Sequence, residues 1–133
     1  MSGIYNKGRE AFLRGQIAWL TDDIKAILVA GAYTPNFTTD QYLSDISAPA
    51  QVAVSNSLSS KTVTNGWAGC ENIVWDTASN GVCVGMVIVQ DTGVAATSHL
   101  LAYLNSGITN FPLDTNGAKV TFFPDPGTGL FRI

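Results

Sequence analysis

The chain has 133 residues, of which 46% are hydrophobic and 13% are charged, and its formal net charge is −3. The length suits one domain, so we expect a single domain over 1–133, with an N-terminal arm or helix at 1–15 and a β domain at 16–133. The acidic balance argues against nucleic-acid binding, and no apolar run reaches the ~18 residues of a membrane span. An average domain carries about 25% charged residues. The surface is therefore predicted to be polar but largely uncharged, which suits lasting protein contacts because few ions must be desolvated.

The chain opens with a predicted short helix at 4–14. Asn6 is expected to serve as its N-cap, and Gly15 to stop it at the C-terminal end. We expect Phe12 and Leu13 to lie on the buried side of this helix, with the basic residues turned outward.

Strands are predicted from residue 16 onward. Residues 16–20 and 24–30 are predicted as strands on either side of an aspartate-containing turn, since the second is rich in β-branched residues. A long connection is expected at 31–50. Two short strands at 51–55 and 61–65 then flank a loop rich in serine.

The strongest strand signal lies at 82–90, which is apolar on both faces and is expected at the centre of a sheet covered on both sides. Gly85 within it indicates a bulge or a close approach of another chain segment. Ser-Asn-Gly at 79–81 predicts a hairpin turn between this strand and 72–77, because asparagine and glycine tolerate positive φ. A further strand is predicted at 99–105.

The last two strands are predicted at 118–123 and 129–133, paired with each other across a turn rich in proline and glycine. Turn signals recur every ~8–15 residues along the second half, and helix signals are few. This spacing predicts a mainly β fold, a single-domain antiparallel β-sandwich or small barrel with a short N-terminal helix.

The chain carries few of the groups that catalysis or metal binding requires. His99 is the only histidine, and it begins an apolar strand, where a partly buried structural role is expected. Cys70 and Cys83 are predicted to be free buried thiols, because local pairing gives them no reason to meet at disulfide spacing. Asp22–Asp23 and 114–117 offer too few oxygens for calcium and are better explained as turns. We therefore predict no enzyme activity, cofactor, metal or small-molecule substrate, with a glycan hydrolase using an unrecognised carboxylate pair as the enzymatic alternative.

Aromatic and basic residues are the candidates for contacts with other proteins. Trp67 lies in a stretch predicted as a loop, where it is either an interface anchor, a role in which tryptophan is enriched, or a cap on the end of the sandwich. Residues 1–14 carry an excess of basic charge, which either meets an acidic partner surface or forms a solvated helix face. The residues predicted to contact a partner are Tyr5, Lys7, Arg9, Trp67, Phe131 and Arg132.

Segments along nearly the whole chain resemble a family of small structural proteins of tailed bacteriophages. The likeness begins with three segments, FLRGQIAWL at 12–20, DIKAILV at 23–29 and AYTPN at 32–36. It continues through YLSDI at 42–46, Leu58 with KTVT at 61–64, QDTG at 90–93, LAY at 101–103, PLxTNG at 112–117 and LFRI at 130–133. These are packing and turn motifs, and the family offers no catalytic residues to carry over.

The resemblance implies a structural component of a phage particle. We expect a head decoration (cement) protein that bridges and stabilises subunits of the major capsid protein, with that protein and copies of itself, a homo-trimer included, as partners. Such a chain is made in the host cytoplasm and ends in the virion, and the interrupted apolar stretch at 11–20 makes a poor signal peptide. The alternative is a tail, connector or head-fibre protein, or a module that binds the host surface.

Overall fold

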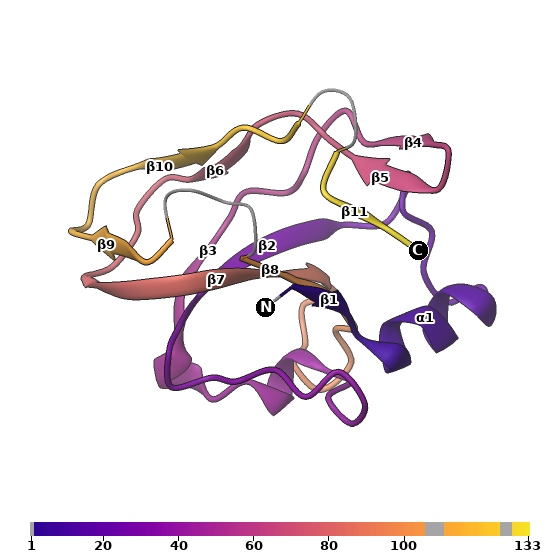
Figure 1. Cartoon of the computed structure of the whole chain (residues 1–133), viewed down its shortest axis with the longest axis horizontal. Coiled ribbons are helices and arrows are strands. Elements are labelled where there is room, and N and C mark those ends of the chain that lie inside the picture. Colours follow the sequence, from indigo (N-terminus) through magenta and orange to yellow (C-terminus); the bar gives the residue numbers. More distant parts are fainter. Residues whose placement is uncertain (1, 106–110, 126–128) are drawn as a thin grey trace.

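A six-stranded antiparallel sheet forms the centre of the fold, and the computed structural model describes residues 2–105, 111–125 and 129–133 (Figure 1). In it, β7 (Gly81–Gln90) lies between β8 (Leu100–Leu104) and β2 (Ile24–Ala30). The edges are formed by β1 (Gly3–Ile4) and β3 (Gln51–Val54). The second half of β7 is fully buried. The prediction of a central strand covered on both faces is therefore confirmed.

Two smaller antiparallel sheets lie over one face of this central sheet (Figure 1). One pairs β6 (Ile73–Trp75) with β10 (Val120–Phe122). The other consists of β4 (Thr62–Thr64), β5 (Trp67–Gly69) and β11 (Phe131–Arg132). The last strand of the central sheet, β9 (Leu113–Thr115), pairs with the start of β7. The mainly β, sandwich-like fold predicted from the sequence is confirmed.

Alternation along the central strands divides the core into two clusters, one on each face of the sheet. In β2, Ile24, Ala26 and Leu28 belong to the cluster that includes residues of the two small sheets, whereas Ile27 and Val29 belong to the other. The second cluster is closed by the chain start and by the connection after β2. Its members outside β2 include Tyr5, Tyr33, Ile46, Ala50, Leu100 and Tyr103.

The connection at 31–50 contains two 3₁₀ helices, η1 (Leu43–Asp45) and η2 (Ala48–Ala50). It supplies Tyr33 and Ile46 to the second cluster, where both side chains are buried. The connection therefore acts as a cover for one face of the central sheet.

The only α-helix in the described ranges is α1 (Asn6–Leu13), which packs against β8. The residue at its N-cap is Tyr5, so the prediction that Asn6 caps the helix is wrong. Gly8 lies on the β8 backbone, where a Cβ atom would be 2.6 Å from the Leu100 carbonyl oxygen. The helix therefore approaches the sheet more closely than any residue with a side chain would allow.

The chain at 16–20 is not a strand, contrary to the prediction. Ile17 and Trp19 are buried, which accounts for the alternating pattern. The backbone nevertheless turns here, because the amides of Thr21 and Asp22 both donate to the Ala18 carbonyl. The predicted strands at 24–30, 51–55, 61–65 and 99–105 do contain β2, β3, β4 and β8.

Both predicted local pairings in the second half are wrong. β6 pairs with β10, with Val120 opposite Trp75, and does not pair with β7. β10 and β11 likewise do not pair with each other, because β11 joins β5 with Phe131 opposite Ala68. β6 and β7 belong to different sheets, as do β10 and β11, so the partners of these strands come from distant sequence.

Gly85 confirms the prediction of a close approach within the central strand. A Cβ atom at this position would lie 2.7 Å from the hydroxyl oxygen of Tyr103 on neighbouring β8. The register of β7 against β2 also shifts just beyond it, between Val29 and Ala30. The missing side chain makes room for a buried tyrosine.

Candidate functional site

Three of the predicted contact residues meet on the sheet formed by β4, β5 and β11. Arg132 lies opposite Trp67, and Phe131 lies opposite Ala68. Thr64 on the other side is also paired with Trp67. Because directly opposed residues point to the same face of a sheet, Thr64, Trp67 and Arg132 form one row across three strands. We call this the Trp67 row.

The Trp67 row lies on the accessible face of the small sheet. Thr64 and Arg132 are exposed, and Trp67 is half-buried. The prediction that Trp67 lies in a loop is wrong, since it is the first residue of β5. Arg132 carries a positive charge on this accessible face.

On the opposite face of the same sheet, Ala68 and Phe131 belong to the core, whereas Val63, opposite Ala68 on the edge strand β4, is exposed. Phe131 is 3% exposed, and its ring meets the Trp19 ring edge-on at 5.3 Å between centroids. The Trp19 indole nitrogen donates to the Thr62 carbonyl at 3.1 Å, which ties the sheet to the chain before β2. The prediction that Phe131 contacts a partner is therefore corrected, since its side chain stabilises the fold from within.

Tyr5 is likewise a core residue and is corrected for the same reason, because its side chain is completely buried. Its hydroxyl lies 2.7 Å from the Tyr33 hydroxyl, and Tyr33 donates to Asp40 at 2.8 Å. Burial is the largest cause that raises the pKa of both tyrosines. Tyr5 thus anchors the start of α1 under the connection.

The basic residues of α1 remain on the surface. Lys7 lies 3.4 Å from Glu10, and Arg14 lies 3.5 Å from the same carboxylate. Arg9 donates to the Asn6 side-chain carbonyl at 3.0 Å. Exposed pairs of this kind contribute about 0–1 kcal/mol, so Lys7 and Arg9 are accessible to a partner at little cost.

Four of the eight large apolar side chains that are more than half exposed in the described ranges belong to α1, β4 and the segments next to them. Leu13 is 88% exposed, and Leu20, Val63 and Ile133 are each 57% exposed. Figure 1 shows α1, β4 and the C-terminal residue at the right-hand end of the view. Leu20 directly follows Trp19, which contacts both β4 and β11.

We call this end of the molecule, formed by Leu13, Leu20, Val63, Ile133 and the Trp67 row, the contact end. Sequence reasoning missed Leu13, which was expected on the buried side of the helix. It also did not single out Leu20 or Val63, which it placed only within predicted strands. Exposure of these three residues depends on where the helix and β4 end, which the pattern of apolar residues does not specify.

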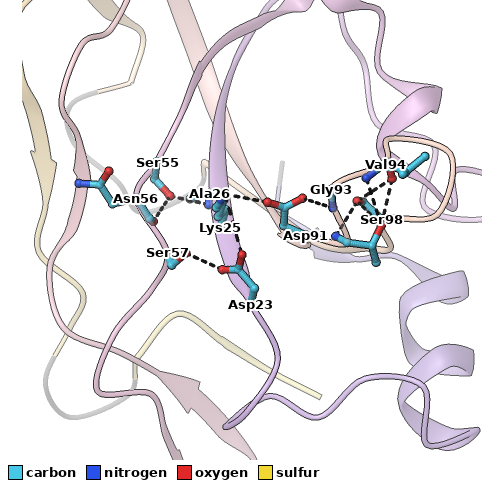
Figure 2. Close-up of polar contacts among 11 residues, drawn as sticks. Asp23, Lys25, Ala26, Ser55, Asn56, Ser57, Asp91, Gly93, Val94 and Ser98 are labelled. Atoms are coloured by element: carbon cyan, nitrogen blue, oxygen red, sulfur yellow. Dashed lines mark hydrogen bonds and ion pairs between the residues drawn. The ribbon is translucent and has the colours of Figure 1, made fainter.

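Lys25 of β2 forms ion pairs with two aspartates, one just before β2 and one just after β7 (Figure 2). Lys25 lies 2.7 Å from Asp91 and 3.9 Å from Asp23, and Asp23 accepts a hydrogen bond from Ser57 at 2.5 Å. The hydrogen bond to Asp91 raises the pKa of Lys25, and the same bond lowers the pKa of Asp91. A general acid needs a raised carboxyl pKa, and the pKa of Asp91 is lowered instead. The Asp91 carboxylate is therefore suited to a structural ion pair with Lys25.

The aspartates predicted as turn residues are used as such. The Asp22 carboxylate accepts hydrogen bonds from the Ala18 amide and from the Gln90 side chain, at 2.8 and 2.7 Å. Within the described ranges, no group of three or more histidine, cysteine, aspartate or glutamate side chains could hold a metal ion. No helix in those ranges is long and apolar enough to cross a membrane.

Cys70 and Cys83 are both free, as predicted. Cys83 is fully buried, and Cys70 is half-buried. Burial raises the pKa of the Cys70 thiol to about 11. The thiolate is the reactive form of cysteine, and the raised pKa keeps this thiol protonated at neutral pH.

Compared with models of known protein families and with curated proteins, the chain matches none. The resemblance of its segments to structural proteins of tailed phages remains a prediction.

Proposed function

We propose that this chain is a structural component of a tailed-phage particle, a decoration protein that bridges and stabilises subunits of the major capsid protein on the head. The observation that carries the proposal is the contact end, where four large apolar side chains are more than half exposed at the same end of the molecule as the Trp67 row. Together with the likeness of its segments to phage structural proteins, this end supports a role in permanent protein contacts.

The composition of the contact end suits a protein partner. Burying a leucine, valine or isoleucine side chain contributes about 1.5–3 kcal/mol, so covering Leu13, Leu20, Val63 and Ile133 supplies several kcal/mol. Tryptophan and arginine are the side chains most enriched among residues that dominate binding energy. Trp67 and Arg132 are adjacent on the sheet, and we propose them as the centre of the interface.

Decoration stabilises a shell by mass action. A protein that binds the assembled shell and not its separated subunits lowers the free energy of the shell with every copy bound. Each copy would bind the shell mainly through apolar contacts. Its affinity for the shell would therefore persist at high salt, because exposed ion pairs contribute little to the binding.

The thermal rupture of phage heads tests this function. Heads stripped of the protein and heads carrying it are heated side by side, and release of DNA is followed with an intercalating dye. We expect the decorated heads to rupture at a higher temperature and re-addition of the purified protein to restore it. Equal rupture temperatures would contradict the proposal.

A second function uses the same end. A half-buried tryptophan on an accessible sheet face also suits a module of the tail, connector or head fibre that binds the host surface. Adsorption to host cells separates the two, since this module would make adsorption depend on Trp67, whereas a decoration protein would leave adsorption unchanged.

A further inference from the structure

His99 lies where two surface segments are joined to the end of β8. It forms an isolated antiparallel bridge with Tyr42. Around the bridge, the Leu43 amide donates to Ser98, the Ser44 amide to Ala95, and the Leu100 amide to Gln41, at 2.9–3.1 Å. We call this junction between segment 41–46 and loop 91–99 the His99 junction.

The imidazole ring of His99 is packed inside this junction. Its centroid lies 5.1 Å from that of the Tyr42 ring. Its Nδ1 atom is buried and makes no hydrogen bond with any residue that the structure describes. On the backbone side, the His99 carbonyl accepts from the Gln90 amide at 2.9 Å, which fixes the residue against β7.

Protonation is unfavourable for a ring held in this way. Neutral imidazole carries one N–H, whereas the imidazolium ion carries an N–H on both nitrogens. Proton uptake would therefore place a donor on buried Nδ1 without an acceptor and a charge in a partly desolvated site, and both cost free energy. Burial lowers the pKa of His99, and no neighbouring carboxylate opposes this effect.

The charged and titratable groups on the surrounding elements are already engaged. On segment 41–46, the Asp45 carboxylate accepts the amides of Gln41 and Tyr42. In loop 91–99, Asp91 is paired with Lys25 and also accepts the Gly93 amide. On α1, which packs on β8, Lys7 and Arg14 flank Glu10.

We propose that His99 is a pH-sensitive latch: when neutral it holds segment 41–46 against loop 91–99, and when protonated it releases them. This device is independent of the proposed function. Its direction follows from linkage. A histidine whose pKa is lowered in the closed state stabilises that state fully above its usual pKa near 6.5, and this stability is lost as the pH falls from that value through the lowered one.

Opening the latch has a structural consequence. Ile46 is buried in the second core cluster, and Leu43 packs against that cluster. Release of segment 41–46 would uncover this face of the central sheet in acid, while the cluster under the two small sheets keeps its cover. Because His99 is the only histidine, it alone among the side chains has an ordinary pKa between pH 5 and 8.

Amide hydrogen exchange at about pH 7.5 and about pH 5 tests the latch. Protection factors, corrected for the intrinsic pH dependence of exchange, are compared for Leu43, Ser44 and Leu100 and for Val87 in the central sheet. We expect the protection of the first three to fall several-fold at the lower pH and that of Val87 to stay constant. In His99→Gln, which cannot be protonated, the loss at low pH should disappear.

Titration of the single histidine by NMR keeps the proposal testable even where the variant does not fold. We expect the His99 ring resonances of the unmodified protein to titrate below the value of a free histidine, as the linkage requires. A pKa at or above that value, or an equal loss of protection at low pH in His99→Gln, would overturn the proposal.

Discussion

Tyr33 is the middle member of a buried chain of polar groups. It shares one hydrogen bond with the Tyr5 hydroxyl and donates another to the Asp40 carboxylate. Asp40 also accepts the Asn36 amide, so the chain ends on a charged group that closes a turn. Loss of the Tyr33 hydroxyl removes two interactions, whereas loss of the Tyr5 hydroxyl removes one.

Two matched substitutions test this order. Tyr33→Phe leaves the buried Tyr5 hydroxyl unsatisfied and should lower the free energy of unfolding by about 1–3 kcal/mol, whereas Tyr5→Phe should lower it by about 0.5–1.5 kcal/mol. Urea denaturation of both variants measures the difference. A Tyr5→Phe variant that is the less stable of the two would contradict the hydrogen-bond arrangement.

The pair formed by Lys25 and Asp91 gives a pH dependence that is separate from that of His99. Because the pKa of Asp91 is lowered in the folded chain, its contribution to stability is present above the usual pKa near 3.9 and is lost as the pH falls through the lowered value. Both side chains are about a quarter exposed, which limits the contribution to about 1 kcal/mol.

Asp91→Asn should therefore reduce stability at neutral pH by about 1 kcal/mol and flatten the loss of stability below about pH 4. Thermal unfolding across this range measures both effects. Asp76→Asn is a suitable control, because Asp76 is exposed on the surface. Identical acid profiles for Asp91→Asn and the unmodified chain would contradict a lowered pKa.

At the level of single residues, the sequence predicted chemistry better than exposure. It predicted free cysteines because local strand pairing does not bring Cys70 and Cys83 together. It predicted a partly buried His99 because no nucleophile or metal ligand in the sequence accompanies it. It failed for Tyr5 and Phe131, which were expected at an interface and lie in the core. A short N-terminal or C-terminal segment shows too few residues for periodicity to reveal which side chains face inward.

Among the elements, strands whose residues are buried on both faces were the most predictable. The apolar run of β7 indicated a central position without any knowledge of partners, whereas β2, which Lys25 interrupts, was predicted only as a strand. The pairing of β6 with β10 and of β11 with β5 was not predictable. Turn motifs report how the chain bends locally, whereas these pairings join strands far apart in sequence and depend on the packing of whole layers.

The helix α1 provides the sharpest test at this scale. In Gly8→Ala the new methyl group would lie 2.6 Å from the backbone oxygen of Leu100, which cannot move without breaking the sheet. We expect a loss of about 1–3 kcal/mol from overpacking, despite the higher helix propensity of alanine. Gly31→Ala is the control, because its Cβ would make only an ordinary contact, 3.7 Å from Val84.

Denaturant midpoints of the two variants decide this point. A stabilised Gly8→Ala would show that the helix lies farther from β8 than the structure places it.

In the whole molecule, the two ends differ in their role in the proposal. The contact end combines Leu13, Leu20, Val63, Ile133 and the Trp67 row. The opposite end, where β7 begins and β9 pairs with it, exposes Val82 beside Asp114 (Figure 1). An interface at the contact end would cover Val63 and leave Val82 in solvent.

Two valine substitutions exploit this difference. Val63 and Val82 are 57% and 51% exposed, so an aspartate at either position should leave folding nearly unchanged. Val63→Asp should weaken binding to stripped phage heads at least tenfold, because the charge would be buried at the interface without a partner. Val82→Asp should bind as the unmodified protein does. Equal binding of both variants in a sedimentation assay would place the interface elsewhere.

The location of the chain on the particle tests the central claim most directly. Electron cryomicroscopy of virions that carry the protein should show it as a regular lattice over the head, with β4, β5 and β11 against the capsid subunits. Density confined to the tail, the connector or a single vertex, or no density at all, would contradict a role as a decoration protein.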